Sequence, residues 1–178
     1  SGYDISLGSG AVVTRVANGS TQTNISTAIS QLNRWYHVVF TVDRDTNTLR
    51  LYLDGTQANS ASLGFGGSFA NTTPLQIARY NGQTADFNGG IDDLRIFGSL
   101  LSAIDANNLY NEGVIDKNLV GYWKFNDSNG TFIQDFSFRN NDGEFKNGAD
   151  VNALGMFDSN AGFFDGTNDY VKVTTPPN

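Results

Sequence analysis

Short runs of alternating apolar and polar residues, separated by Gly, Asn and Asp, recur along most of this 178-residue chain. In residues 36–42 and 48–53 every second side chain is apolar, and a polar turn of five residues lies between the two runs. Strand side chains alternate between two faces, so a period of two predicts half-buried antiparallel strands joined as a hairpin. The chain is therefore expected to fold mainly as antiparallel sheet.

Similar runs predict further strands at residues 3–7, 11–16, 74–79, 90–97, 119–125, 131–136, 143–146, 161–164 and 170–173. One helix is predicted. Ser102 and Asp105 form a capping-box start, Ile104 and Leu109 supply a short apolar stripe, and Gly113 ends it. Many short strands with one short helix are typical of an all-β antiparallel sandwich.

Composition excludes several classes of function. The chain has 18 acidic and 11 basic residues, a net charge of −7 and no Lys/Arg cluster, so nucleic-acid binding is not expected. It has no cysteine, which excludes disulfides and thiolate metal sites and leaves cations held by oxygen ligands. No apolar run reaches the roughly 20 residues of a membrane span. No signal peptide is visible at Ser1, so we expect a soluble, mature segment.

Two blocks of sequence resemble the laminin G-like, concanavalin A-like lectin family of jelly-roll β-sandwiches. The opening pattern of the family is matched by LVGYWKFNDSNG, QDFSFRNNDGEF and FDGTNDYVKV. Its closing pattern is matched by RWYHVVFTVD, LRLYLDG and FNGGIDDLRIFGSLLSAIDANNLY. The resemblance implies an antiparallel jelly-roll with one short helix, and a module that binds carbohydrate or another extracellular ligand.

The two blocks stand in reversed order. Residues 1–117 resemble the C-terminal half of such a sandwich and residues 118–178 resemble the N-terminal half. The internal strand that the family places between them, an apolar stretch containing Trp, has no match. Three arrangements are compatible with this order: one permuted sandwich, parts of two adjacent repeats, or a sandwich completed by a strand from a neighbouring subunit.

Catalysis is not expected. Glycoside hydrolysis needs two carboxyl groups that flank the scissile bond. The only glutamates, Glu112 and Glu144, lie far apart in sequence, and in a continuous strand Asp92 and Asp93 would point to opposite faces. The only histidine, His37, has no nucleophile or orienting carboxylate at a recognisable spacing, so a structural role is expected.

Calcium is a possible structural cofactor, because hard cations bind carboxylate and carbonyl oxygens from polar turns. The turn in FDGTNDY supplies Asp165, Asn168 and Asp169, and the resemblance adds Asp92, Asp93 and Asp127 as metal ligands. The alternative is that these residues only form turns. The acidic turn at residues 43–47 also has alternate oxygen-bearing residues, but Thr48 replaces the glycine of a calcium loop, so a plain hairpin turn is preferred.

Sugars are usually bound by exposed aromatic faces together with amides and carboxylates. The polar loop before residues 90–97 carries such a set and is predicted as the ligand-binding site: Tyr80, Asn81, Gln83 and Asp86. A purely solvated loop is the alternative. The two tryptophans, Trp35 and Trp123, lie in strand patterns and are expected in the core.

These observations favour a non-catalytic, secreted or cell-surface module that binds glycans or an extracellular protein in adhesion. Asn-X-Ser/Thr triplets give weak support for this location; they begin at Asn18, Asn24, Asn71, Asn126 and Asn129. The second hypothesis is a structural repeat or subunit of an extracellular fibre, in which neighbouring copies exchange strands. A sandwich that lacks a strand would expose core residues and open sheet edges, which favour self-association.

Overall fold

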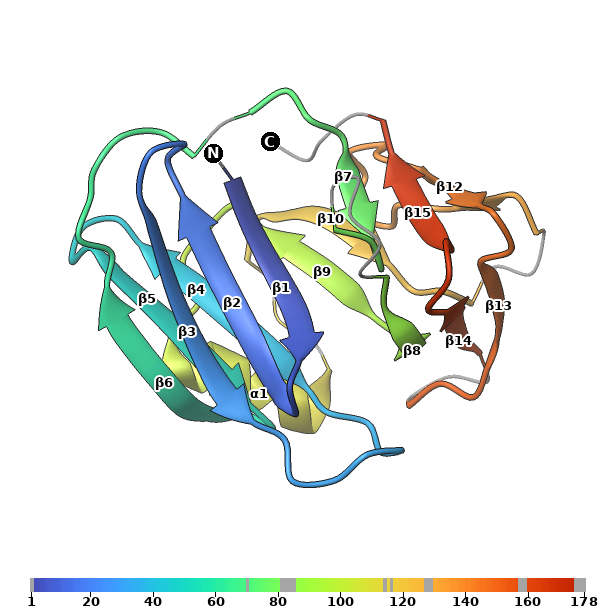
Figure 1. Cartoon of the computed structure of the whole chain (residues 1–178), viewed down its shortest axis with the longest axis horizontal. Coiled ribbons are helices and arrows are strands. Elements are labelled where there is room, and N and C mark those ends of the chain that lie inside the picture. Colours follow the sequence, from blue (N-terminus) through green and yellow to red (C-terminus); the bar gives the residue numbers. More distant parts are fainter. Residues whose placement is uncertain are drawn as a thin grey trace. The chain divides into compact units, whose positions relative to one another are not determined.

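The computed structural model (Figure 1) describes residues 2–69, 71–80, 86–113, 115, 117–126, 130–156 and 160–174. The chain forms two compact units. Unit 1 comprises Ser1–Asn71 and Ser99–Lys117, and unit 2 comprises Thr72–Gly98 and Asn118–Asn178. Each unit is therefore assembled from two separate segments of the sequence.

Unit 1 contains two three-stranded antiparallel sheets (Figure 1). The first has the order β1-β2-β3, with bounds Gly2–Gly8, Ala11–Ala17 and Gln22–Ala28. The second has the order β4-β5-β6, with bounds Val38–Asp43, Thr48–Leu53 and Thr56–Ser62. The predicted hairpin is confirmed by the register of β4 and β5, in which Phe40 lies opposite Leu51.

The core of unit 1 lies between these sheets. Apolar side chains from both sheets pack into one buried cluster: Val12, Val16, Ile25, Leu49, Leu51 and Leu63. The alternation read from the sequence explains this packing, because every second residue of β2 and of β5 faces the opposite sheet.

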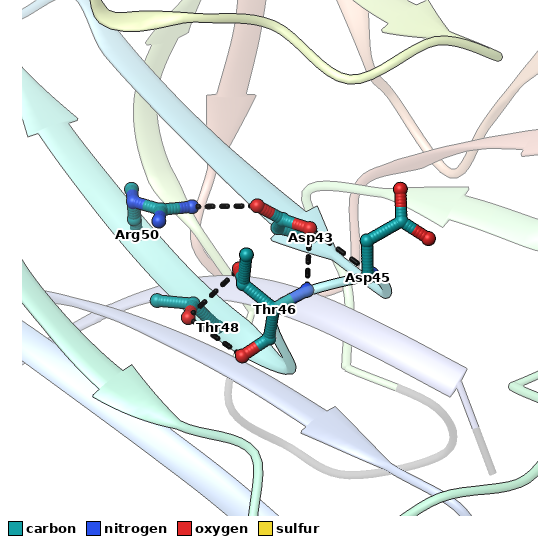
Figure 2. A network of polar contacts seen from close by, with 5 residues as sticks. All are labelled: Asp43, Asp45, Thr46, Thr48 and Arg50. Carbon is teal, nitrogen blue, oxygen red and sulfur yellow. Dashed lines mark hydrogen bonds and ion pairs between the residues drawn. The ribbon is translucent and has the colours of Figure 1, made fainter.

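The turn between β4 and β5 is held by Asp43 (Figure 2). One carboxylate oxygen of Asp43 accepts hydrogen bonds from the backbone N–H groups of Asp45 and Thr46, at 3.1 and 3.0 Å. The other oxygen lies 3.3 Å from Arg50. Hydrogen bonds from Thr46 hold the pKa of Asp43 below its usual value. Both carboxylate oxygens of Asp43 are thus engaged by groups of the hairpin, and the preference for a plain turn over a calcium loop stays a prediction.

Helix α1, Ala103–Glu112, belongs to unit 1 and has the predicted caps. The Ser102 side chain accepts from the Asp105 N–H, Asp105 accepts from the Ser102 N–H, and Gly113 ends the helix in the left-handed conformation at φ 69°. Hydrogen bonds from Lys117 and Ser102 lower the pKa of Asp105 to about 2. In the described part of the chain no helix is long and apolar enough to span a membrane.

Unit 2 contains a four-stranded sheet, a three-stranded sheet and a strand pair, all antiparallel. The four-stranded sheet has the order β11-β12-β15-β7, with bounds Phe132–Ile133, Gly143–Lys146, Tyr170–Val173 and Leu75–Ile77. The three-stranded sheet has the order β13-β14-β8, with bounds Asp150–Ala153, Ala161–Asp165 and Asn88–Ile91. The pair joins β9, Leu94–Phe97, to β10, Leu119–Trp123.

Unit 2 brings together strands from the two blocks that stand in reversed order in the sequence. Strands β7, β8 and β9 of the closing block pair with β15, β14 and β10 of the opening block. One buried cluster joins them: Ile77, Trp123, Phe125, Ile133, Phe145, Ala149, Val151, Phe164, Val171 and Val173. The blocks therefore close on each other within one chain in unit 2, whereas the division into parts 1–117 and 118–178 stays a prediction.

The predicted continuous strand at residues 90–97 is interrupted in the structure. Strand β8 ends at Ile91 and β9 begins at Leu94, with Asp93 in the left-handed conformation at φ 52°. The expectation that Asp92 and Asp93 alternate along one strand is therefore wrong, because both residues lie in the break between β8 and β9. Trp123 is fully buried as expected, whereas Trp35 is only partly buried and precedes β4.

Candidate functional site

The β9-β10 pair of unit 2 presents a polar and aromatic face. Alternation along β10 and the residues after it places Gly121, Trp123 and Phe125 in the buried interior. A side chain on Gly121 would come within 2.6 Å of the Trp123 ring, which explains why glycine occupies this position. Tyr122 and Lys124 alternate with these residues and are only partly buried. Tyr122 lies directly opposite Arg95 of β9.

Asp93, Arg95 and Tyr122 form a connected polar group. The Tyr122 hydroxyl donates to Asp93 Oδ1 at 2.6 Å and accepts from Arg95 at 2.9 Å. Arg95 also pairs with Asp93 at 3.3 Å, and both charged side chains are 16% exposed. Burial, together with the hydrogen bond to Asp93, raises the pKa of Tyr122 to about 12. The phenol therefore stays protonated at neutral pH and is fixed in orientation.

Arg95, Lys124 and Phe136 make cation-π and ring contacts around Tyr122. The Arg95 guanidinium lies 4.4 Å from the centre of the Tyr122 ring, and Phe136 meets that ring edge-on at 6.3 Å. The Lys124 ammonium lies 5.0 Å from the Phe136 ring centre and 5.5 Å from that of Tyr122. These five residues, Asp93, Arg95, Tyr122, Lys124 and Phe136, are called the aromatic-cationic face below.

The aromatic-cationic face contains two cations, Arg95 and Lys124, in a chain whose net charge is −7. Arg95 is paired with Asp93, whereas Lys124 makes no ion pair with any carboxylate that the structure describes. Its ammonium interacts with the two rings through cation-π contacts, which are weak when exposed to water.

A buried carboxylate fixes the loop that supplies Phe136. Asp135, 5% exposed, accepts through Oδ1 from the N–H groups of Tyr122 and Ser137, at 2.9 and 2.8 Å. Through Oδ2 it accepts from the Ser137 hydroxyl at 2.8 Å and from the Asn141 N–H at 3.0 Å. The Phe136 N–H in turn donates to the Tyr122 carbonyl at 2.8 Å. The backbones that carry the two rings are therefore locked together.

The hydrogen bonds of Asp135 depend on its ionised form. Burial by itself would raise the pKa of the carboxyl group, but the hydrogen bonds from Ser137, Asn141 and Tyr122 outweigh it and lower the pKa. The carboxylate is therefore ionised at neutral pH.

The same loop presents a second aromatic residue. Phe138 is 95% exposed and lies in the left-handed conformation at φ 66°, which is uncommon for an aromatic residue. A large exposed apolar side chain on a constrained backbone costs stability without contributing to the core. Residues that bind ligands lie disproportionately often on loops.

This arrangement suits binding better than catalysis. Aromatic rings can pack on the apolar face of a ring-shaped ligand, while Lys124 and Arg95 offer donors. Tyr122 is held protonated and Asp93 is held by Tyr122 and Arg95, so neither is poised as a general base. Of the glutamates, Glu112 lies at the end of α1 in unit 1, and Glu144 pairs with Lys146 on β12 of unit 2.

The structure describes two of the four residues predicted to bind ligand. Tyr80 is 40% exposed. The Asp86 side chain is only 1% exposed and lies 3.5 Å from Arg79, with which it forms a single β-bridge. Arg79 also stacks on the ring of Tyr170 at 4.7 Å. The Asp86 carboxylate is thus turned inward, and Asn81 and Gln83 lie outside the described residues.

The predicted metal ligands are engaged in local hydrogen bonds. Asp165 accepts from the Thr167 N–H at 2.7 Å, and Asp169, 2% exposed, accepts from the Asp165 N–H at 3.1 Å. The Asn168 carbonyl accepts from Asn147 at 3.0 Å. These bonds fix the turn between β14 and β15.

Of the other predicted ligands, the structure describes Asp92 and Asp93, and each has a partner of its own. Asp92 accepts from the Met156 N–H at 2.8 Å, Asp93 belongs to the aromatic-cationic face, and Asp127 lies outside the described residues. Among the residues that the structure describes, no three acidic or histidine side chains group closely enough to share an ion. Calcium binding therefore stays a prediction, and no step below depends on it.

The aromatic-cationic face was not predicted from the sequence. Part of it is visible there, because alternation in LVGYWKF separates Tyr122 and Lys124 from the residues that enter the core. The partners Arg95 and Phe136 come from other segments and carry no local signal that links them to β10. His37, which was expected to be structural, packs against Tyr110 of unit 1, with ring centres 5.8 Å apart.

The fold defines the class of protein, an antiparallel β-sandwich protein. The chain belongs to the concanavalin A-like lectin/glucanases superfamily, since the laminin G-type model of that superfamily matches residues 2–106, more than half of its length. The resemblance seen in the sequence is thereby confirmed, and so is the all-β antiparallel fold with one short helix.

A solved structure has a similar fold. It is the 1.50 Å crystal structure of a candidate carbohydrate-binding protein from Bacteroides ovatus ATCC 8483, with a TM-score of 0.52 and 18% sequence identity. The match covers 94% of this chain and 43% of that protein, so this chain spans less than half of its length. No curated protein matches the sequence.

Proposed function

We propose that this chain is a non-catalytic carbohydrate-binding module and that the aromatic-cationic face binds the sugar. The observation that carries the proposal is the Lys124 ammonium, which lies over the rings of Tyr122 and Phe136 without an ion-pair partner among the described residues. The superfamily and the sugar-binding description of the Bacteroides ovatus protein support the same function.

The charge of the face favours one class of sugar. Arg95 is paired with Asp93, whereas Lys124 has no ion-pair partner among the described residues. A saccharide with carboxylate or sulfate groups would neutralise Lys124 while its ring packs against Phe136. We therefore infer that uronic-acid or sulfated polysaccharides bind more tightly than neutral glucans.

The proposal extends to the setting of the module. We propose that it acts at the cell surface or outside the cell, in adhesion, as part of a longer protein. Its superfamily and its match to less than half of a longer protein support this setting. If calcium takes part, the turn between Asp165 and Asp169 is the proposed place for it. Sugar binding measured with calcium and again with a chelator tests whether calcium is needed.

Titration of anionic and neutral polysaccharides against single variants tests the binding face. Phe136→Ala is expected to weaken binding of every bound sugar by about tenfold, because the stacking surface is lost. Lys124→Ala is expected to weaken binding of anionic sugars by a similar factor and to leave neutral sugars unchanged. Isothermal titration calorimetry at fixed ionic strength gives both affinities.

Matched controls come from the same unit. Phe132, 54% exposed on β11, is the control aromatic residue, and Lys172 on β15 is the control lysine. Alanine at either control position should leave the affinity unchanged. Equal losses in the control variants, or no loss in the Phe136 and Lys124 variants, would contradict the proposed site.

A structural role is the second candidate function, and one observation favours it. The apolar face of β1 in unit 1 is half exposed, with Tyr3, Ile5 and Leu7 each close to 50% accessible. Exposed apolar residues of this kind favour contact with another protein surface. A fibre or repeat array would then show polymers in solution scattering that grow with protein concentration, in the absence of any sugar.

A further inference from the structure

We propose that the loop after Phe136 adds a second sugar subsite, made of Phe138 and Arg139, so that the site holds two anionic units of one polysaccharide chain. This inference rests on the proposed function and adds the length and the charge pattern of the ligand. Phe138 is 95% exposed, and Arg139 and Asn140 beside it are exposed as well. These three residues are called the loop tip below.

The loop tip is anchored at both ends. On one side, Asp135 accepts from the Ser137 N–H and hydroxyl, each at 2.8 Å. On the other side, it accepts from the N–H of Asn141 at 3.0 Å, and the carbonyl of this buried residue accepts from Trp123. Because the residues on either side are fixed to the core of unit 2, the tip is presented on a constrained backbone, which lowers the entropic cost of binding.

Phenylalanine is an unfavourable residue at position 138. The backbone is left-handed there and at Asn140, with φ 66° and 57°. Glycine and asparagine adopt this conformation readily, whereas a bulky aromatic residue rarely does. The Phe138 ring is also left in water and contributes little burial to the core. Strained residues cluster at ligand-binding sites, so the ring is assigned to a ligand contact.

Phe138 and Arg139 together match an anionic sugar. They are neighbours in the chain, so their Cα atoms lie about 3.8 Å apart. An aromatic ring packs on the apolar face of a pyranose, and a guanidinium donates two parallel hydrogen bonds to a carboxylate or sulfate. One uronic-acid or sulfated unit can make both contacts, whereas a neutral sugar would use only the ring.

The same combination of ring and cation is found at Phe136 and Lys124, where the ammonium lies 5.0 Å from the ring centre. Phe138 follows Phe136 by two residues, so their Cα atoms lie no more than roughly 7 Å apart. Two pairs of ring and cation this close together fit nearby units of one polymer, because separate ligands would crowd each other. The ligand is therefore expected to repeat its anionic groups along the chain.

Isothermal titration calorimetry with oligogalacturonates and chondroitin sulfate fragments of defined length tests the second subsite. For the fragment that wild type binds most tightly, Phe138→Gly and Arg139→Ala should each weaken binding about tenfold, because one ring or one cation contact is lost. Asn140→Gly is the matched control: it also places glycine at a left-handed position of the tip, and it should leave the affinity unchanged. A neutral cello-oligosaccharide should bind Arg139→Ala as it binds wild type.

Chemical unfolding of the tip variants separates a ligand contact from a structural role. Phe138→Gly should be at least as stable as Phe138→Ala, because glycine adopts φ 66° without strain, while both variants should bind the anionic fragment equally weakly. Unchanged binding by Phe138→Gly and Arg139→Ala would overturn the subsite. Binding that recovers together with stability in Phe138→Gly would also overturn it.

The same titrations distinguish failure of the subsite from failure of the proposed function. If the Phe136 and Lys124 variants bind the fragments more weakly and the tip variants do not, only the second subsite is wrong. If neither series of fragments binds wild type, the proposed function and the subsite are both wrong.

Discussion

Replacement of Asp135 by alanine is expected to destabilise unit 2 by about 3 kcal/mol or more and to abolish sugar binding at the aromatic-cationic face. The carboxylate accepts four hydrogen bonds, three of them from backbone N–H groups. Its loss leaves buried donors without an acceptor, and each such donor costs about 1–3 kcal/mol. The loop that carries Phe136 also loses its link to Tyr122.

Chemical unfolding measures the loss of stability. A background Trp35→Phe variant leaves Trp123, which is fully buried in unit 2, as the only tryptophan reporter of that unit. Asp150→Ala is the matched control, because Asp150 is an exposed residue of β13 whose carboxylate accepts hydrogen bonds from the neighbouring Val151 and Asn152 in the described part of the chain. A change below about 0.5 kcal/mol for Asp135→Ala would place it among ordinary surface substitutions and contradict the proposed lock.

The same carboxylate predicts a pH dependence. The pKa of Asp135 is lower in the folded chain than in the unfolded chain, where it is about 3.9. Its stabilisation is therefore fully present above the unfolded pKa and is lost as the pH falls through the folded pKa. Unfolding curves between pH 2 and pH 6 should show this loss in wild type and a smaller loss in Asp135→Asn.

The second large effect is expected for Trp123→Ala, which should destabilise unit 2 by about 3–5 kcal/mol. The indole ring is fully buried in the core cluster of unit 2 and packs over Gly121. Its Nε1–H donates to the Asn141 carbonyl at 3.0 Å, and the Asn141 side chain donates to the Val120 carbonyl at 2.8 Å. The substitution therefore removes core volume and one support of the Asp135 loop.

Hydrogen exchange of the unit 2 amides measures this effect without a tryptophan signal. Trp123→Phe is the matched variant: it keeps most of the apolar volume, loses the hydrogen bond to Asn141, and should cost less than half as much. Equal protection of unit 2 in wild type and in Trp123→Ala would contradict the central place of this residue in the core.

Elements with strong local signals were predicted well. Strands β1, β2 and β5 follow from strict alternation, and the bounds of α1 follow from Ser102, Asp105 and Gly113. These signals act within a few residues, so they are readable from sequence. Strands β3 and β6 were missed because QTNISTA and TQANSAS are almost entirely small or polar, and their pairing with apolar neighbours decides their conformation.

The candidate site was harder to predict for a physical reason. The polar loop around Tyr80 has the composition of a sugar site, but in the described part of it Asp86 turns inward to Arg79. The aromatic-cationic face instead depends on the pairing of β9 with β10 and on hydrogen bonds from Asp135 across to Tyr122. Contacts between segments this far apart leave no pattern in composition or spacing.

The most direct test of the account is an NMR titration of the chain with the anionic polysaccharide fragment that it binds most tightly. The account predicts that the ring signals of Tyr122 and Phe136 and the side-chain signals of Lys124 shift together, in proportion to saturation. Shifts confined to residues around Tyr80, or to unit 1, with the Phe136 and Lys124 signals unchanged, would contradict it.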